Sequence, residues 1–558
     1  EREVRLVNRK IRQLAVALIA CYVALFAALN YWQVSREEQL ESQPDNTRKL
    51  IREFDKPRGQ IVTADGVIAA RSVPAEADSD VKFVRQYPTG DLFANVTGYH
   101  TFALGSTQVE RTRTDILTGS TSVQQLRAIP ALLGGDPDNS GSIRLTLRED
   151  LQQTAKFLLG PREGSIVVLE TATGAVRAMW SYPSYDPNLI ANPDYDAAFA
   201  ALTELQADPR DPLLANAYQQ RYMPGSVFKV FTMSVALDDG VVTLESFFPD
   251  EREYVPPQTT DPVQNYGGST CGGDLATVFA RSCNTPFARI AVDLGAERFP
   301  AGMARWGFGE PVPIDLPRPV ASTIGDTSNL AQNLPLLAMR GFGQNEDQLV
   351  PIHMAMAAAA VANGGVMMKP YVVDAELDHQ GRVLNRTQPE AWKTPITPGT
   401  AAILTDLMIG VALRGTASCC IGLAGGIPVA AKTGTAQLNA AGEPEASHLW
   451  ITAFAPADAP KYAVVVMLKG TDEEISAGTG GRVAGPIAKA MLDVVFASDA
   501  AALVPPPVDA GTDPTSGSTP AVPTDPATGL PAEPPTDTSP APATEATTDP
   551  AIDDGANG

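Results

Sequence analysis

The stretch RYMPGSVFKVFT, residues 221–232, places a serine directly after Pro224-Gly225 and a lysine three residues later in an otherwise apolar run. Pro-Gly interrupts the preceding segment, and the apolar sequence after it predicts a buried helix that starts near Ser226 and ends before Gly240. Lysine is scarce in this chain, since only 12 of its 42 basic residues are lysines. A lysine in such a helix therefore suggests a function.

Ser226 and Lys229 are three residues apart, so a helix places them on one face. Ser226 also lies where unpaired backbone N–H groups and the positive end of the helix dipole point outward. The segment thus supplies a hydroxyl nucleophile, an amine within reach and donors for a developing oxyanion. An amine acts as a base only when it is neutral, and burial or a second nearby cation would lower its pKa enough.

The SxxK spacing is weak by itself. The chain contains another example, Ser79 to Lys82, in a polar segment to which we assign no chemistry. A serine at a helix start is most often only an N-cap.

Two further motifs support the first one. RSCNT (281–285) contains the SxN sequence of Ser282 and Asn284, and AAKTGTAQ (430–437) contains the KTG sequence that begins at Lys432. Ser226 and Ser282 are 56 residues apart, and Ser282 and Lys432 are 150 apart. The order SxxK, SxN, KTG is that of penicillin-binding proteins and class A β-lactamases.

The chain resembles a class B penicillin-binding protein, and within that class the actinobacterial penicillin-binding protein A group. The resemblance covers roughly residues 11–498 and includes, besides the three motifs, the segments KPRGQIVTADG, RQYPTGDLFANVTGY, VANGGVMMKP, HLWITAFAP and GTGGRVAGPIAKAML. It implies the penicillin-binding transpeptidase or serine β-lactamase-like α/β fold, an antiparallel sheet with helices on both faces. A mostly β membrane-proximal pedestal and a single transmembrane helix would precede that domain.

The resemblance also implies catalytic roles. Ser226 would be the acylated nucleophile and Lys229 its general base. Ser282 would relay a proton between the catalytic amine and the leaving group, while Lys432 would tune the electrostatics of the site.

Substrate-binding roles follow in the same way. Asn284 would hold the peptide amide of the substrate, and the Lys432-Thr433-Gly434-Thr435 segment would bind the donor, with the two threonines on its terminal carboxylate. The backbone N–H groups of Ser226 and Thr435 would form the oxyanion hole.

The implied reaction is peptidoglycan D,D-transpeptidation, in which D-alanine leaves a D-Ala-D-Ala stem peptide and a neighbouring stem amine takes the acyl group. β-Lactams would acylate the same serine, and no metal or organic cofactor would be needed. The implied partners are a polytopic glycan polymerase and other divisome or elongasome proteins. A D,D-carboxypeptidase, a serine β-lactamase and a non-catalytic scaffold of the wall-synthesis complex remain alternatives.

The composition limits other classes of function. A formal net charge of −22 argues against a nucleic-acid partner. From residue 504 onward the chain has nine acidic and no basic residues among many prolines, threonines and alanines, a composition that predicts a disordered tail.

An apolar run over residues 14–32 is about 28 Å long as a helix, which matches the hydrocarbon thickness of a membrane. Five basic residues precede it, and the positive-inside rule therefore predicts a cytoplasmic N-terminus and an extracytoplasmic remainder. A lipoprotein box ending at Cys21 and a cleaved signal peptide are the alternatives.

An extracytoplasmic location would allow the four cysteines other than Cys21 to form disulfides. Cys271 and Cys283 are a candidate disulfide in an oxidising compartment, but with Cys419 and Cys420 three pairings are open, and buried free thiols are a fourth alternative. No metal site is predicted, because no CxxC pair occurs and histidines are few.

The predicted domains are a cytoplasmic N-terminus (1–12), an anchor (13–33), the pedestal (34–158), the transpeptidase domain (159–500) and the tail (501–558). Hairpins are predicted at Asp65-Gly66, at Thr173-Gly174 and within residues 448–470, and helices over residues 351–365 and 483–497. Strands at both ends of the large domain, with helices between them, suggest that its two ends pair in one sheet.

Overall fold

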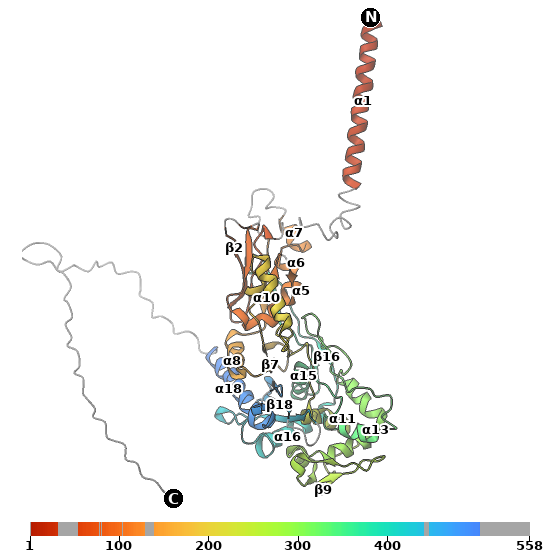
Figure 1. Ribbon diagram of the computed structural model, residues 1–558, viewed down its shortest axis with the longest axis vertical. Coiled ribbons are helices and arrows are strands. Elements are labelled where there is room, and N and C mark those ends of the chain that lie inside the picture. The colour runs from red at the N-terminus through yellow and green to blue at the C-terminus, as the bar shows by residue number, and fades with distance from the viewer. Residues whose placement is uncertain are drawn as a thin grey trace, which may run out of the picture. The chain divides into compact units, whose positions relative to one another are not determined.

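The computed structural model describes residues 2–31, 54–76, 79, 81–102, 104–128, 139–439, 446–471 and 473–502 (Figure 1). The described residues up to Ala500 belong to one compact unit by their internal contacts. The acidic tail predicted from residue 504 lies outside the described residues, as does Trp32 at the end of the predicted anchor.

The first element is a single helix, α1 (Arg2–Asn30). Its segment Arg9–Asn30 has a mean hydropathy of 2.0 and is long and apolar enough to cross a membrane. The apolar side chains of this segment are exposed, so no described part of the chain covers them. The helix therefore fits the predicted single-pass anchor.

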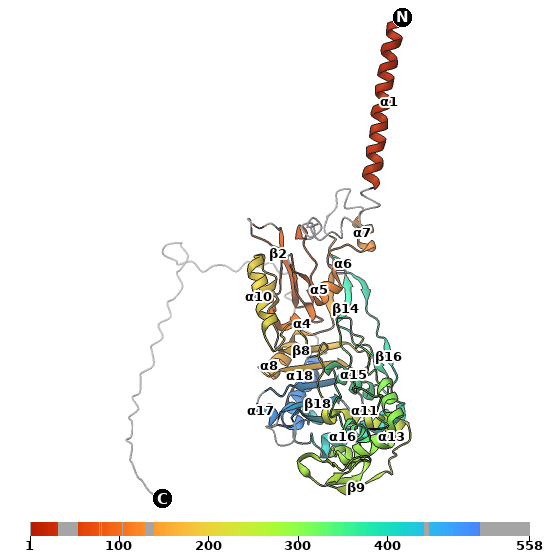
Figure 2. The ribbon, with the colours of Figure 1, turned by 45° about the vertical axis from the view of Figure 1, so that its right-hand side comes forward.

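The pedestal contains a six-stranded sheet in the order β15-β14-β6-β1-β2-β3 (Figure 2). Its strands are β1 (Ile61–Val62), β2 (Ile68–Pro74), β3 (Phe83–Gln86), β6 (Ser142–Leu145), β14 (Val373–Leu377) and β15 (Val383–Arg386). The hairpin predicted at Asp65-Gly66 joins β1 to β2, with Gly66 at φ 87°. Two of the strands come from the middle of the chain, which the sequence did not suggest.

Helices also run through this region, which is less purely β than the sequence predicts. They are η2 (Gly90–Phe93), α4 (Ala94–Thr97), α5 (Gln108–Thr112), α6 (Thr114–Leu117) and α7 (Ser122–Ala128), with the short strands β4 (His100–Thr101) and β5 (Gly105–Ser106) between them. A small core cluster of Ala94, Tyr99, Tyr185 and Ile190 joins these helices to the chain that follows β8 (Val176–Tyr182).

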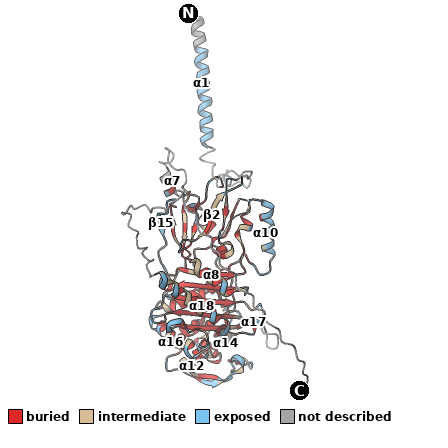
Figure 3. Ribbon diagram, turned by 90° about the vertical axis from the view of Figure 1, so that its left-hand side faces the viewer, coloured by how far each residue is buried: buried red, intermediate tan, exposed pale blue. Residues whose placement is uncertain are grey.

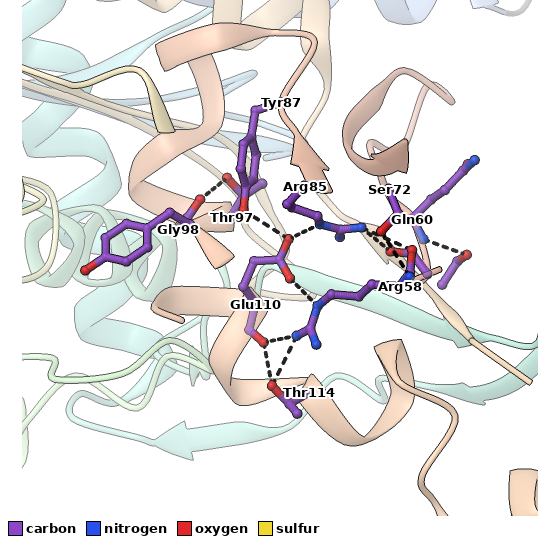
Figure 4. A network of polar contacts seen from close by, with 12 residues as sticks. Arg58, Gln60, Ser72, Arg85, Tyr87, Thr97, Gly98, Glu110 and Thr114 are labelled. Atoms are coloured by element: carbon purple, nitrogen blue, oxygen red, sulfur yellow. Dashed lines mark hydrogen bonds and ion pairs between the residues drawn. The ribbon is translucent and has the colours of Figure 1, made fainter. Parts of the chain in front are cut away.

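A buried carboxylate holds the pedestal together (Figure 4). Glu110 accepts from Nε of Arg58 at 2.7 Å, from Nε of Arg85 at 2.6 Å and from the hydroxyl of Tyr87 at 3.3 Å. Burial by itself would raise the pKa of Glu110, but the charges of Arg85 and then Arg58 outweigh it and lower the pKa to about 2. The cluster ties helix α5 to strand β3 and to the chain that enters the sheet.

The large domain is built on a five-stranded antiparallel sheet in the order β17-β18-β19-β7-β8. The strands besides β8 are β7 (Gly164–Glu170), β17 (Ala430–Gln437), β18 (Ser447–Ala455) and β19 (Tyr462–Leu468). Strand β19 pairs with β7, with Val465 opposite Val167, so the two ends of the domain meet in one sheet as predicted.

Nearly every residue of these strands is buried, on both sides of the sheet (Figure 3). Helices must therefore cover both faces. The helices of the domain are α8 (Glu149–Leu159), α9 (Pro187–Ile190), α10 (Tyr195–Ala207), α11 (Lys229–Asp238), α12 (Leu275–Ala280), α13 (Thr285–Arg305), α14 (Leu334–Arg340), α15 (Pro351–Ala362), α16 (Pro398–Arg414), α17 (Glu473–Ser476) and α18 (Gly485–Ala502).

Shorter elements complete this domain: β9 (Phe247–Glu251), β10 (Glu253–Tyr254), β11 (Val263–Gln264), β12 (Cys271–Asp274), β13 (Met367–Met368), β16 (Ala391–Lys393), η4 (Gly225–Phe228), η5 (Tyr266–Gly268), η6 (Ala424–Gly426) and η7 (Gly480–Ala484). The predicted hairpins β7–β8 and β18–β19 and the predicted helices α15 and α18 are present. Helix α8, which the predicted boundary at residue 158 leaves in the pedestal, packs on β8 and β7 of the large domain.

Candidate active site

Three distant segments of the chain meet at Ser282. Lys229 donates hydrogen bonds from Nζ to the carbonyl oxygen of Ser282 at 2.7 Å and to Oδ1 of Asn284 at 2.8 Å, and its Nζ lies 3.3 Å from Oγ of Ser282. Lys432 donates from Nζ to the same Oγ at 2.8 Å. Residues of the SxxK, SxN and KTG motifs are thus joined directly by hydrogen bonds.

Ser226 lies in the 3-10 turn η4, and the α-helix α11 begins only at Lys229. The sequence predicted an α-helix from near Ser226. The structure differs in that a tighter 3-10 turn precedes the α-helix. Residues i and i+3 of a 3-10 turn lie almost directly above one another, so Ser226 and Lys229 remain on the same side.

Glycine allows η4 to press against the KTG strand. Gly225 has φ 53°, and a Cβ at this position would lie 2.4 Å from the carbonyl oxygen of Thr435. A Cβ at Gly434 would lie 2.7 Å from the carbonyl oxygen of Pro224. Any larger residue at either position would push Ser226 away from β17.

A cavity of about 770 Å³ opens at this junction. Among its lining residues are the half-buried Ser226 together with Ser282, Asn284, Thr433 and Thr435. Lys229 and Lys432 are completely buried and lie behind this wall rather than in it, and Gly434 does not line the cavity either.

The SxN segment is held from several sides. Ser282 has φ 60°, a left-handed conformation that is uncommon for a non-glycine residue. Its neighbour Cys283 forms a disulfide with Cys271 of β12, with a Cα–Cα distance of 5.7 Å. Oδ1 of Asn265 accepts from the backbone N–H groups of Asn284 and Thr285. These contacts fix the loop that carries the Ser282 hydroxyl and the Asn284 amide.

The two lysines lie in apolar surroundings. The Nζ of Lys229 is 5.3 Å from the ring centre of Phe287 and 5.9 Å from that of Phe342. Burial, and after it the charge of Lys432, hold the pKa of Lys229 well below its usual range. Burial alone lowers the pKa of Lys432 to about 7. Both amines therefore lose their proton at a lower pH than an ordinary lysine.

A neutral Lys229 amine suits this geometry. It has two N–H groups, which donate hydrogen bonds to the carbonyl oxygen of Ser282 and to Oδ1 of Asn284. Its lone pair is then free to accept a proton from a hydroxyl group. The arrangement can activate an alcohol without a histidine.

The KTG segment lies in the edge strand β17. The hydroxyl of Thr433 shares a hydrogen bond of 2.6 Å with that of Thr416, and Oγ1 of Thr435 accepts from the backbone N–H of Gly480 at 3.4 Å. Both threonines face the cavity, where a substrate carboxylate could reach them.

Sequence reasoning missed several residues of the site. Asn265, Thr416 and the rings of Phe287 and Phe342 support the motifs, but they come from segments without a recognisable pattern. The two aromatic rings are spaced along the chain like ordinary core residues. Only the folded structure identifies them as neighbours of the lysine.

Trp450 and His448, next to the KTG strand in β18, do not line the cavity. Trp450 is fully buried, and its indole N–H donates to the carbonyl oxygen of Met223 at 3.0 Å. His448 accepts from the backbone N–H of Gly470 and packs edge-on against Tyr222. Both residues pack within the fold and are not part of the cavity wall.

The structure contains a second disulfide, between the adjacent residues Cys419 and Cys420. Cys419 is exposed and lines the cavity. Of the three pairings that the four cysteines allow, the structure therefore has Cys271 with Cys283 and Cys419 with Cys420. Among the described residues, no group of histidine, cysteine, aspartate and glutamate side chains could hold a metal ion.

Comparison with known proteins gives two family matches. The penicillin binding protein transpeptidase domain matches residues 164–493, and the penicillin binding protein A dimerisation domain matches residues 58–143. The first match covers the five-stranded sheet and all three motifs, and the second covers most of the pedestal.

Individual relatives agree with these matches. The chain is 35% identical to the peptidoglycan D,D-transpeptidase PbpA of Mycolicibacterium smegmatis over 495 residues, which cover 87% of this chain and 98% of the relative. It is 33% identical to PbpA of Mycobacterium tuberculosis over 500 residues, 88% of this chain and 99% of the relative. The ceftriaxone acyl-enzyme structure of penicillin-binding protein A from M. tuberculosis has a TM-score of 0.73 at 32% identity, covering 79% of this chain and 99% of that one.

Proposed function

Since the chain belongs to the penicillin-binding protein transpeptidase family, we propose that Ser226 is its acylated nucleophile and Lys229 the base that activates it. The chain is a peptidoglycan D,D-transpeptidase, a serine acyl-transferase that cross-links stem peptides and binds β-lactams covalently. The observation that carries our assignment is the pair of hydrogen bonds from Lys229 to the Ser282 carbonyl and to Asn284, which leave the lone pair of a neutral amine available.

In the first step, Oγ of Ser226 attacks the carbonyl carbon of the D-Ala-D-Ala bond, and Lys229 takes the hydroxyl proton. The backbone N–H groups of Ser226 and Thr435 stabilise the negative charge on the carbonyl oxygen. The contact between Gly225 and the Thr435 carbonyl supports this pairing of N–H groups, because it brings the two backbones together.

Collapse of the tetrahedral intermediate breaks the C–N bond and expels D-alanine. Ser282 passes the proton from Lys229 to the leaving amine, a role supported by its position between the Nζ atoms of Lys229 and Lys432. In the second step, an amine of a neighbouring stem attacks the ester and returns a proton by the same route, and Ser226 is regenerated.

Binding roles follow from the cavity wall. Asn284 holds the peptide amide of the donor with the part of its side chain that faces the cavity. Thr433 and Thr435 bind the terminal carboxylate, and Gly434 between them keeps the strand close to Ser226. Lys432 supplies positive charge near that carboxylate below its pKa of about 7.

We also propose the topology and the partners. The N-terminus (1–12) is cytoplasmic, residues 13–33 cross the membrane, and the pedestal (34–158) and transpeptidase domain (159–500) are outside, with 501–558 as a tail. The basic residues before the apolar run of α1 support this orientation. The pedestal and anchor contact a polytopic glycan polymerase, and deletion of the pedestal would abolish co-purification of that polymerase.

Product analysis tests the reaction. Full-length chain in detergent is incubated with a stem pentapeptide and an acceptor amine, and the products are separated. We expect cross-linked product and free D-alanine from the wild type and neither from Ser226→Ala. Trimmed tetrapeptide as the sole product would indicate a carboxypeptidase, and unchanged turnover by Ser226→Ala would remove Ser226 from the mechanism.

A further inference from the structure

The candidate active-site cavity carries only positive charge among its described lining residues. Arg281 and Arg482 line it, and no aspartate or glutamate is among the described lining residues. The chain as a whole has a formal net charge of −22. A cationic cavity in so acidic a protein is built for an anionic ligand.

Arg482 is fixed beside the KTG strand by its two glycine neighbours in η7. A Cβ at Gly481 would lie 2.1 Å from the carbonyl oxygen of Thr416 and 3.4 Å from Cγ2 of Thr433. A Cβ at Gly480 would lie 2.2 Å from the carbonyl oxygen of Trp450. The backbone of η7 therefore packs directly against β17 and β18. Gly481, the residue before Arg482, lies next to the side chain of Thr433.

The guanidinium of Arg482 has no partner of its own. Its side chain is exposed and forms no ion pair or side-chain hydrogen bond with the described part of the chain. Arg281, which lines the same cavity, differs because its Nη2 donates to the carbonyl oxygen of Thr270 at 2.8 Å. Arg482 is therefore the free guanidinium of the described cavity wall.

We propose that Arg482 binds a carboxylate of the donor stem peptide and makes the enzyme select anionic donors. This inference rests on the proposed function. A guanidinium fork pairs with a carboxylate through two parallel N–H donors, which a threonine hydroxyl cannot provide. Two carboxylates of a stem peptide could be the partner: the terminal one of D-alanine or a side-chain one further along the stem. The position of Arg482 beside Thr433 favours the terminal carboxylate.

The test uses benzylpenicillin, whose single carboxylate stands for that of the terminal D-alanine, and its methyl ester, which lacks the charge. Second-order rate constants for acylation are measured for the full chain, Arg482→Gln, Arg482→Lys and Arg281→Gln. A bidentate, charge-assisted contact corresponds to roughly a 10-fold to 100-fold effect. We expect Arg482→Gln to lose that much with the acid and to react normally with the ester, which also shows that the variant is folded.

The other variants separate geometry from net charge. Arg482→Lys should recover part of the loss, while Arg281→Gln removes one charge from the same cavity and should keep the preference for the acid over the ester. An equal loss of that preference in Arg281→Gln would show a general charge effect and overturn the assignment.

A second arm uses stem pentapeptides with a free or an amidated side-chain carboxylate. If Arg482→Gln slows only the free form and leaves benzylpenicillin unchanged, the side-chain carboxylate is the partner and the proposal stands. If Arg482→Gln reacts like wild type with every acid, the proposal is wrong while the acylation of Ser226 is untouched. A wild-type chain that is not acylated would instead overturn the proposed function, and this inference with it.

Discussion

Lys432 donates a hydrogen bond from Nζ to Oγ of Ser282 at 2.8 Å, although 150 residues of chain separate the two. The Nζ atom of Lys229 lies 3.3 Å from the same oxygen. One hydroxyl thus stands between two buried amines whose pKa values are both lowered.

Replacement of Lys432 should shift the pH dependence of acylation. The charge of Lys432 helps to lower the pKa of Lys229, so Lys432→Met should let that pKa rise. Because the base acts only when neutral, the acidic limb of the acylation rate should move to higher pH. Acylation rates are measured with penicillin from pH 5 to 10. The ratio of the rate at pH 6 to the rate at pH 9 should be lower in Lys432→Met than in wild type. Lys469→Met, which removes a partly buried lysine paired with Glu163, is the control and should leave the profile in place.

Replacement of Lys229 should stop activation of the nucleophile. General-base catalysis contributes about 100-fold to 10,000-fold, so Lys229→Met should lower the acylation rate by at least about 100-fold. The measurement is stopped-flow or gel-based labelling with a fluorescent penicillin at pH 7.5. A rate within threefold (about 0.7 kcal/mol) of wild type would show that another group takes the proton.

The buried Glu110 should be essential for the stability of the pedestal. Glu110→Gln leaves the charges of Arg58 and Arg85 without their counter-charge, and breaking a buried pair in this way costs about 3–5 kcal/mol. Glu390→Gln is the matched control, because Glu390 pairs with Lys369 at the surface and should contribute less than about 1 kcal/mol. Chemical denaturation of the two variants compares the losses directly.

The same glutamate predicts how stability depends on pH. Its folded pKa of about 2 lies below its ordinary value of 4.5, so its contribution is complete above pH 4.5 and is lost as the pH falls towards 2. Wild type and Glu110→Gln should therefore converge in stability as the pH falls through this window. A constant difference between them would contradict the assigned pKa.

The two disulfides should differ sharply in their effect on stability. The bond between Cys271 and Cys283 closes a loop of 12 residues, so replacing both by serine should cost about 3 kcal/mol. The bond between Cys419 and Cys420 joins neighbours and closes no loop, so the matching double replacement should cost little by this mechanism. Equal losses in the two double variants would show that loop closure is not the cause.

The sequence predicted the turns and the helix end whose conformation depends on a few adjacent residues. Thr173-Gly174 and Asp65-Gly66 form the expected turns, and the glycines after residue 362 end α15, because turn and cap conformations are properties of a few adjacent residues. The addition of β14 and β15 to the pedestal sheet has no such signal, because it depends on pairing across some 230 residues.

The candidate site was predictable in part for the same reason. The residues that we propose for the reaction lie in three motifs, which are recognisable by their order and spacing. Asn265, Thr416 and Arg482 reach the cavity only because distant loops fold against the motifs, so no pattern in their own segments marks them. The apolar run around Lys229 indicated its burial, whereas its contacts with Ser282 and Asn284 required the structure.

Intact-mass analysis of the full chain after exposure to penicillin tests the central claim most directly. We expect a mass increase of one penicillin per chain, located by peptide mapping on Ser226 and absent from Ser226→Ala. A folded chain that gains no mass, or that carries the penicillin on another residue, would contradict the account.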